Sequence, residues 1–115
     1  MIGGEGADTL TANGNDDILV AGLTNFDSRS TAGHEEFWCD VWSEWTSANS
    51  FSARVQNLRD GTGGNAHNNG SFLFPNVVDD LMAGSIDTLI GSSGSDWLLF
   101  EAGEDIVAGP AEASN

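Results

Sequence analysis

Five aspartates recur at a nine-residue spacing and could supply oxygen ligands to a metal ion. Asp8 and Asp17 form the first pair, and Asp87, Asp96 and Asp105 continue the spacing near the other end of the chain. Glycine, asparagine or serine residues precede most of these aspartates, and glycine allows the left-handed backbone of a tight turn. Such a turn can direct carbonyl oxygens and one carboxylate to a single point. Calcium is a hard cation that binds about six to eight oxygen ligands, so the pattern predicts calcium-binding turns, with about one to three ions.

The candidate metal ligands are the aspartates together with the small or amide-bearing residues of the turns. Residues 3–8 form the most complete turn, and residues 91–96 keep two glycines and the aspartate. The full set of candidate ligands is Gly3, Gly4, Gly6, Asp8, Asn13, Asn15, Asp17, Asp27, Asp87, Gly91, Ser93, Asp96 and Asp105. The alternative is that these segments are ordinary Gly-Asp turns between short strands, with no metal. Aspartates in phase with apolar residues favour the calcium interpretation.

An apolar residue follows each of the five aspartates by two positions. These residues are Leu10, Leu19, Leu89, Leu98 and Val107. Each turn is therefore expected to lead into a short strand, which buries little surface on its own. The apolar residue becomes buried only when copies stack above and below it, so the unit is stable only in a stack.

The combined pattern, G-G-x-G-x-D-x-U-x with U a large apolar residue, resembles the calcium-binding parallel β-roll of the RTX (repeats-in-toxin) family. In that family successive turns fall on alternate sides of the roll, and calcium lies between stacked turns. The expected fold is mainly β with an α insertion: a parallel β-roll formed by the N- and C-terminal nonapeptide repeats and capped by a helical hairpin. We expect a single domain over the 115 residues, with repeats at 1–22, an insertion at 23–81, further repeats at 82–109 and a tail at 110–115.

Residues 34–48 of the insertion read as an amphipathic helix. The apolar face is expected to contain Phe37, Trp38, Val41, Trp42 and Trp45, with Cys39 as a small core residue. The remaining arc is expected to carry Glu35, Glu36, Asp40 and Glu44. A second helix is predicted at residues 51–59, with Ser50 able to cap its start. Phe72 and Phe74 alternate as in a β-strand.

The insertion and the segments that follow it carry a second resemblance. Residues 50–63 read S-F-S-A-R-V-Q-N-L-R-D-G-T-G, and Gly-Ser-Phe, Asp-Asp and Asp-Trp follow at 70–72, 79–80 and 96–97. This order is similar to a segment found between RTX-like repeats in very large bacterial surface proteins, notably from planctomycetes. Residues 37–40 depart from it, being bulkier than the alanine- and leucine-rich helix of that family. The resemblance implies a C-terminal or repeated module of a secreted or surface-displayed calcium-binding protein, with no catalytic activity.

The chain is strongly acidic, with a formal net charge of −15 from 18 acidic and 3 basic residues. Such a chain repels phosphate groups, so neither a nucleic-acid partner nor insertion into a membrane is expected. No stretch reaches the length of a transmembrane helix. One cysteine excludes an internal disulfide, which fits an extracellular or cell-surface bacterial protein that is ordered by metal instead, and fits a cytosolic protein as well. Bound calcium would also relieve the repulsion between carboxylates and so stabilise the fold.

The residue patterns of common enzyme active sites are missing from the sequence. His34-Glu35-Glu36 lacks the second histidine of an H-E-x-x-H zinc site, since His67 lies far along the chain. Neither a Gly-x-Ser-x-Gly nucleophile turn nor a Gly-Lys-Ser/Thr phosphate loop occurs. We therefore expect a non-enzymatic protein.

A second function remains open: the chain could itself be a self-assembling subunit of an extracellular filament. Met1 falls at the apolar position of a repeat, and residues 107–109 finish a strand on which another unit could dock. Open β-roll ends of this kind tend to pair with another chain, either another copy or a flanking module. Head-to-tail contacts that do not close form filaments by end-to-end stacking.

Overall fold

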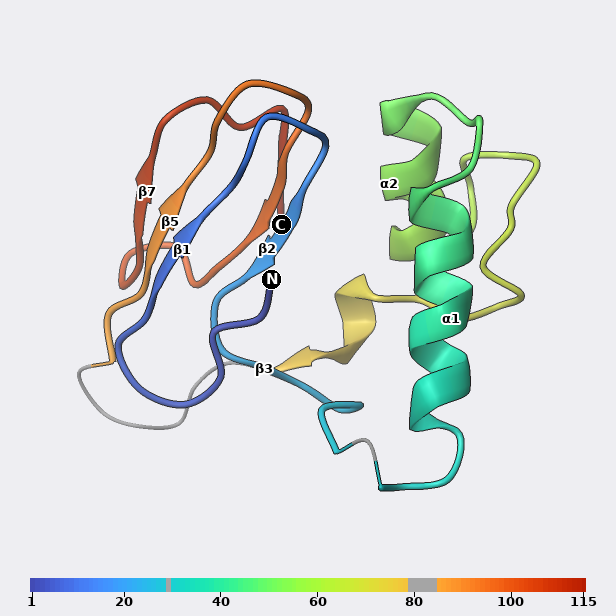
Figure 1. The fold of residues 1–115 in the computed structure, drawn as a ribbon, viewed down its shortest axis with the longest axis horizontal. Coiled ribbons are helices and arrows are strands. Elements are labelled where there is room, and N and C mark those ends of the chain that lie inside the picture. The colour runs from blue at the N-terminus through green and yellow to red at the C-terminus, as the bar shows by residue number, and fades with distance from the viewer. Residues whose placement is uncertain (29, 79–84) are drawn as a thin grey trace. The chain divides into compact units, whose positions relative to one another are not determined.

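Short strands from the two ends of the chain pair with one another in the computed structural model, which describes residues 1–28, 30–78 and 85–115 (Figure 1). The chain divides into two compact units. The repeat unit consists of Met1–Leu23 and Val77–Asn115, and the helical unit is Thr24–Asn76. Each unit has its own buried residues and is described separately.

The strands of the repeat unit form two separate parallel sheets of three strands each. The first sheet has the order β1 (Thr9–Thr11), β5 (Thr88–Ile90), β7 (Ile106–Ala108). The second has the order β2 (Ile18–Val20), β6 (Trp97–Leu99), β8 (Ala113–Ser114). Alternate repeats therefore contribute to different sheets, and strands far apart in the sequence become neighbours (Figure 1).

The register of both sheets places equivalent repeat positions opposite one another. Leu10 pairs with Leu89, which pairs in turn with Val107. Leu19 pairs with Leu98 in the second sheet, so the apolar position predicted from the repeat forms aligned columns. Leu89 and Leu98 are fully buried and belong to one apolar cluster, whereas Val107 at the end of its column is 39% exposed.

The helical unit contains the two predicted helices. Helix α1 spans His34–Trp45 and helix α2 spans Phe51–Arg59, so the predicted limits of the second helix are confirmed. The Ser50 side chain caps α2 by accepting a hydrogen bond from the Ala53 N–H (3.2 Å), as serine commonly does at a helix start. The remaining strands, β3 (Leu23–Thr24) and β4 (Val77–Val78), pair with each other, and both Leu23 and β4 belong to the repeat unit.

The predicted apolar face of α1 is partly wrong. Its buried residues are Phe37, Val41, Glu44 and Trp45, which form one stripe along the helix. Trp42 is 66% exposed, because it lies five residues from Phe37 and roughly 140° around the helix. Cys39 is also exposed and is not a core residue. Glu44, expected on the polar arc, is fully buried.

The strand predicted around Phe72 and Phe74 is also wrong. A short 3-10 helix, η1, spans Phe74–Asn76, and the following strand β4 begins only after it. Asn76 stabilises this turn twice, since its N–H donates to Leu73 O (2.9 Å) and its side-chain amide donates to Phe72 O (2.7 Å). Local hydrogen bonding of an asparagine to nearby backbone therefore replaces strand pairing here.

The predicted fold class, a mainly β protein built as a parallel β-roll capped by a helical hairpin, is corrected by these findings. The described residues form a small α/β domain with two helices and short strands in separate parallel sheets, and no long roll occurs among them. In the part of the chain that the structure describes, the two α-helices contain as many residues as the eight strands together. The repeat spacing identifies the local turn and strand, but it does not specify how far the stack extends.

Candidate metal-binding turns

The predicted aspartates lie in the turns before the strands and form a ladder along each sheet. In the first sheet the Asp8 N–H donates to Asp87 Oδ1 (2.7 Å), and the Asp87 N–H donates to Asp105 Oδ1 (3.0 Å). In the second sheet the Asp17 N–H donates to Asp96 Oδ1 (3.1 Å). Each of these bonds joins one repeat to the next in the stack. Residues 82–84, within one predicted turn, lie outside the described residues.

Glu112 takes the place of a further aspartate in the second sheet. Its Oε2 accepts a hydrogen bond from the Asp96 N–H (2.7 Å), as Asp96 Oδ1 accepts one from Asp17. This segment, predicted to be a tail, contains β8, which pairs with β6. Glu112 lies 16 residues after Asp96, so the nine-residue spacing does not find it. An acidic residue directly before a short strand was the available signal.

The second carboxylate oxygen of three aspartates closes the turn to which the residue belongs. Asp17 Oδ2 accepts a hydrogen bond from the Asn13 N–H (2.9 Å). Asp96 Oδ2 accepts one from the Ser92 N–H (2.8 Å), and Asp105 Oδ2 accepts one from the Glu101 N–H (2.9 Å). In Asp96 and Asp105 both carboxylate oxygens accept backbone N–H groups, and in Asp17 the oxygen that faces the turn accepts one. These carboxylates therefore hold the turns in shape.

Asp8 differs from the other aspartates at the oxygen that faces its own turn. Among the described residues, Asp8 Oδ2 is a buried side-chain oxygen with no hydrogen-bond partner. A Cβ placed on Gly3 would lie 3.2 Å from this oxygen, so the turn backbone closes around it. The Gly4 N–H, which matches the donors of the other turns, instead donates to Gly22 O (2.8 Å). A buried carboxylate oxygen without a donor is a suitable ligand for a cation.

Glycines at two predicted ligand turns are needed for close packing of backbone on backbone. A Cβ on Gly91 would lie 1.6 Å from Pro110 O, and one on Gly94 would lie 2.4 Å from Asn15 O. Neither position has room for a side chain. These glycines are therefore explained by the stacking of turns, whether or not an ion binds nearby.

The remaining candidate ligands hold local turns. The Asn15 N–H donates to Asn13 Oδ1 (3.2 Å), and Ser93 O accepts a hydrogen bond from the Ser92 hydroxyl (3.3 Å). Gly6, in the complete turn with Asp8, has a positive φ of 103°. Asp27 belongs to the helical unit, where its carboxylate accepts hydrogen bonds from the Thr24 N–H (3.0 Å) and hydroxyl (2.5 Å).

The side chains alone do not assemble a metal site in the part of the chain that the structure describes. Within these residues, no group of three or more His, Cys, Asp or Glu side chains is placed to hold a metal ion. A cation at the Asp8 turn would therefore take most of its oxygen ligands from backbone carbonyls. Calcium accepts such ligands readily, whereas zinc is held by His, Cys and carboxylate side chains.

A buried carboxylate, not expected from the sequence, organises the helical unit. Glu44 Oε1 accepts hydrogen bonds from the Asn49 and Asn57 side-chain amides (2.9 and 3.0 Å), and Oε2 accepts one from the His67 N–H (2.5 Å). Asn57 and Asn68 are also buried, and the Asn68 amide donates to Asn57 O (3.0 Å). Burial by itself raises the pKa of Glu44. The hydrogen bonds from Asn57, Asn49 and His67, with the charge interaction with His67, outweigh burial and hold the pKa below its usual value.

The lowered pKa of Glu44 predicts a loss of stability in acid. The stabilisation is fully present above the unfolded-state pKa, near 4.5, and disappears as the pH falls through the lower folded-state pKa. Urea unfolding measured in steps from about pH 7 to pH 3 tests this, with Glu44→Gln as the comparison, because that variant keeps the size of the side chain but cannot titrate. The wild-type protein should lose more stability than the variant below about pH 4.5. Equal losses in the two proteins would contradict the prediction.

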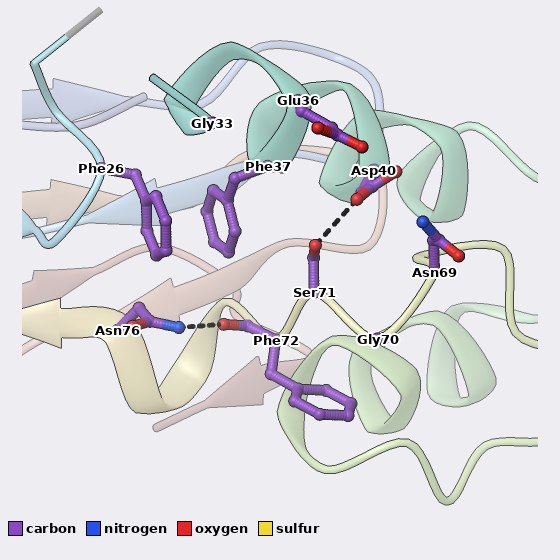
Figure 2. Close-up of a pocket in the computed structure, with 10 residues that line it drawn as sticks. All are labelled: Phe26, Gly33, Glu36, Phe37, Asp40, Asn69, Gly70, Ser71, Phe72 and Asn76. Atoms are coloured by element: carbon purple, nitrogen blue, oxygen red, sulfur yellow. Dashed lines mark hydrogen bonds between the residues drawn. The ribbon is translucent and has the colours of Figure 1, made fainter. Parts of the chain in front are cut away.

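The helical unit also contains a pocket of about 380 Å³, shown in Figure 2. Phe26 and Phe37 stack on one side of it, with ring centroids 3.7 Å apart. On the other side the Ser71 hydroxyl donates to Asp40 Oδ2 (2.8 Å), as the dashed line in Figure 2 marks. A carboxylate therefore fixes the Ser71 hydroxyl. The pocket is lined by residues of α1 and of the segment before η1.

No helix among the described residues combines the length and the apolar character that crossing a lipid bilayer requires. Comparison of the chain with protein-family models, curated proteins and solved structures found no match in any of the three.

Proposed function

We propose that the chain is a non-enzymatic calcium-binding structural module of a secreted or surface-displayed bacterial protein, in which calcium orders the turns of the repeat unit. The observation that carries the proposal is the buried, unpartnered Oδ2 of Asp8 in the most complete glycine-rich turn. The acidic composition supports a role for a divalent cation, because the net charge of −15 opposes compaction. The extracellular location rests on the two resemblances of the sequence, with which the single cysteine is compatible.

The fit to calcium differs from turn to turn. At residues 3–8, the Asp8 carboxylate and the carbonyl oxygens of the turn would hold the ion, whose charge would compensate the buried carboxylate oxygen. In the turn of Asp96 both carboxylate oxygens accept backbone N–H groups, and in the turn of Asp17 the Oδ2 that faces the turn accepts one. We therefore propose the strongest calcium site at the Asp8 turn, with the other turns formed by hydrogen bonding.

The non-enzymatic part of the proposal has support of its own. The acidic residues with the most regular placement, those of the ladders, accept hydrogen bonds from backbone amides and so hold the fold. A carboxylate used in this way stabilises one conformation of the chain and does not need to face a substrate.

Calcium titration by calorimetry tests the proposal, using the wild-type protein, Asp8→Asn and Asp17→Asn. Asp8→Asn should lower the calcium affinity by about tenfold or more, because it removes the charge of the ligand that has no competing donor. Asp17→Asn is the matched control: it lies at the same position of the next repeat, and its calcium affinity should stay near that of the wild type. Its own effect should be a loss of about 1 kcal/mol in the free energy of unfolding, since the Asn13 N–H exchanges a charged acceptor for a neutral amide oxygen.

Calcium should also raise the stability of the wild-type protein by mass action, by about 2.7 kcal/mol at a concentration one hundred times the dissociation constant. The same gain should be missing in Asp8→Asn. A wild-type protein that releases or absorbs no heat with calcium, and whose unfolding midpoint is the same in calcium and in chelator, would overturn the proposal.

A further inference from the structure

Strand β7 has an open edge and exposed apolar side chains. Ile106 and Val107 are 54% and 39% exposed, whereas Leu89 on the adjacent strand is fully buried. Ile106 and Val107 belong to β7, the last strand in the order β1-β5-β7. One edge of β7 therefore pairs with β5, and the other has no strand beside it among the described residues. An edge strand with exposed apolar side chains readily takes up another strand.

We propose that β7 takes up β1 of a second copy of the chain. The register is already defined within the sheet: Leu10 of β1 lies opposite Leu89, and Leu89 lies opposite Val107. If the second copy pairs in this register, its Leu10 lies opposite Val107 and continues the apolar column. β1 is the other edge of the same sheet, and within residues 1–28, 30–78 and 85–115 no strand pairs with its outer side.

The carboxylate ladder extends across this contact in the same way. Within one chain the Asp8 and Asp87 N–H groups each donate to the aspartate of the next strand. Asp105, the last in this sheet, instead donates its N–H to Glu101 O in its own turn (3.1 Å). A second copy would bring its Asp8 carboxylate to the position where a further ladder acceptor belongs. Backbone pairing, apolar packing and the ladder therefore all select β1 as the partner of β7.

The second sheet adds a condition to this contact. Residues Met1–Gly3 lie beside β2, with the Val20 N–H donating to Met1 O (2.8 Å) and the Gly3 N–H donating to Val20 O (2.9 Å). Pairing of the second copy's β1 with β7 shifts that copy by three strand positions along the stack. Its residues 1–3, which lie beside β2 in the second sheet, then fall at the position that β8 occupies. The incoming segment and β8 therefore compete for β6, and β8 is a two-residue strand that can be displaced.

Sedimentation velocity over a range of protein concentrations tests the inference. The wild-type mass should rise with concentration, and Val107→Pro should stay at the mass of one chain. In β7 the Ile106 N–H points to β5, where it donates to Asp87 O (2.8 Å), so the Val107 N–H points to the open side. Proline at position 107 therefore removes a donor from the open edge while leaving the pairing with β5 in place. Val107→Thr, which keeps the N–H and the shape, is the matched control and should associate like the wild type.

Ala113→Pro tests the competition with β8. The Ala113 N–H donates to Asp96 O (3.1 Å), so proline weakens β8 and should increase the associated fraction at a given concentration. A wild-type protein that keeps the mass of one chain at every concentration, or a Val107→Pro protein that associates as well as Val107→Thr, would overturn the inference. An unchanged associated fraction in Ala113→Pro would overturn the competition. Each measurement is repeated in chelator, so that failure to bind calcium and failure to associate are distinguished.

Discussion

Replacing Glu44 with alanine is expected to lower the free energy of unfolding of the helical unit by about 3 kcal/mol or more. Glu44 is fully buried and receives three hydrogen bonds, from the side chains of Asn49 and Asn57 and from the His67 N–H. Alanine would remove all three acceptor contacts and leave a cavity in place of the carboxylate. Each buried donor that loses its acceptor costs about 1–3 kcal/mol.

The two asparagine side chains would keep part of their hydrogen bonding in this variant. The Asn49 amide also donates to Asn65 O (2.9 Å), and the Asn57 amide also donates to Gly64 O (3.0 Å). The largest single loss is therefore expected at the His67 N–H. Hydrogen exchange should show faster exchange in α1, α2 and the loop of residues 60–70, with smaller changes in the repeat unit.

Glu35→Ala is the matched control, because it removes a glutamate from the exposed side of the same helix. Its cost should stay below about 1 kcal/mol, the size of a surface charge near a helix start. Urea unfolding followed by tryptophan fluorescence compares the two variants. If Glu44→Ala costs no more than Glu35→Ala, the carboxylate does not organise the helical unit.

Glu44 also shows why part of this fold could not be read from the sequence. The spacing of apolar residues predicts a helix at 34–48, and the structure has one that begins at His34 and ends at Trp45, but the prediction places every charged residue on the solvent side. Burial of Glu44 depends on donors from the turn after α1, from α2 and from the loop that follows it. These donors come together only through tertiary structure. Local periodicity therefore predicts the helix and assigns one of its residues to the wrong face.

The repeats show the complementary case. The nine-residue spacing predicts where the strands begin and which residues face the core, and Leu89 and Leu98 occupy those positions. The same spacing cannot separate an aspartate that closes a turn from one that is free to bind a cation, because both need a carboxylate at the same place. At Asp17 the Asn13 N–H donates to the carboxylate, whereas at Asp8 the equivalent Gly4 N–H donates to Gly22 O. That contact comes from outside the repeat, so the repeat pattern does not contain it.

Leu89→Ala is expected to cost about 2–5 kcal/mol of the stability of the repeat unit, the range for a buried leucine truncated in a packed core. Leu89 is fully buried between Leu10 and Val107 in the register of the first sheet. Val107→Ala, at the same repeat position one strand further, should cost less than about 1.5 kcal/mol in dilute protein, since valine is smaller and 39% exposed there. Urea unfolding of both variants, with hydrogen exchange of β1 and β5, measures the two costs. Similar costs in dilute protein would mean that the apolar column does not end at β7.

The comparison becomes more informative when it is repeated in concentrated protein. If a second copy covers β7, Val107 changes from a partly exposed residue to a buried one, and the cost of truncating it should rise towards that of Leu89. The cost of Leu89→Ala should change less, because Leu89 is already buried within one chain. A cost for Val107→Ala that depends on protein concentration would therefore tie the packing of the core to the association of copies. The same residue would then set both how far the apolar column extends and whether the stack continues into the next chain.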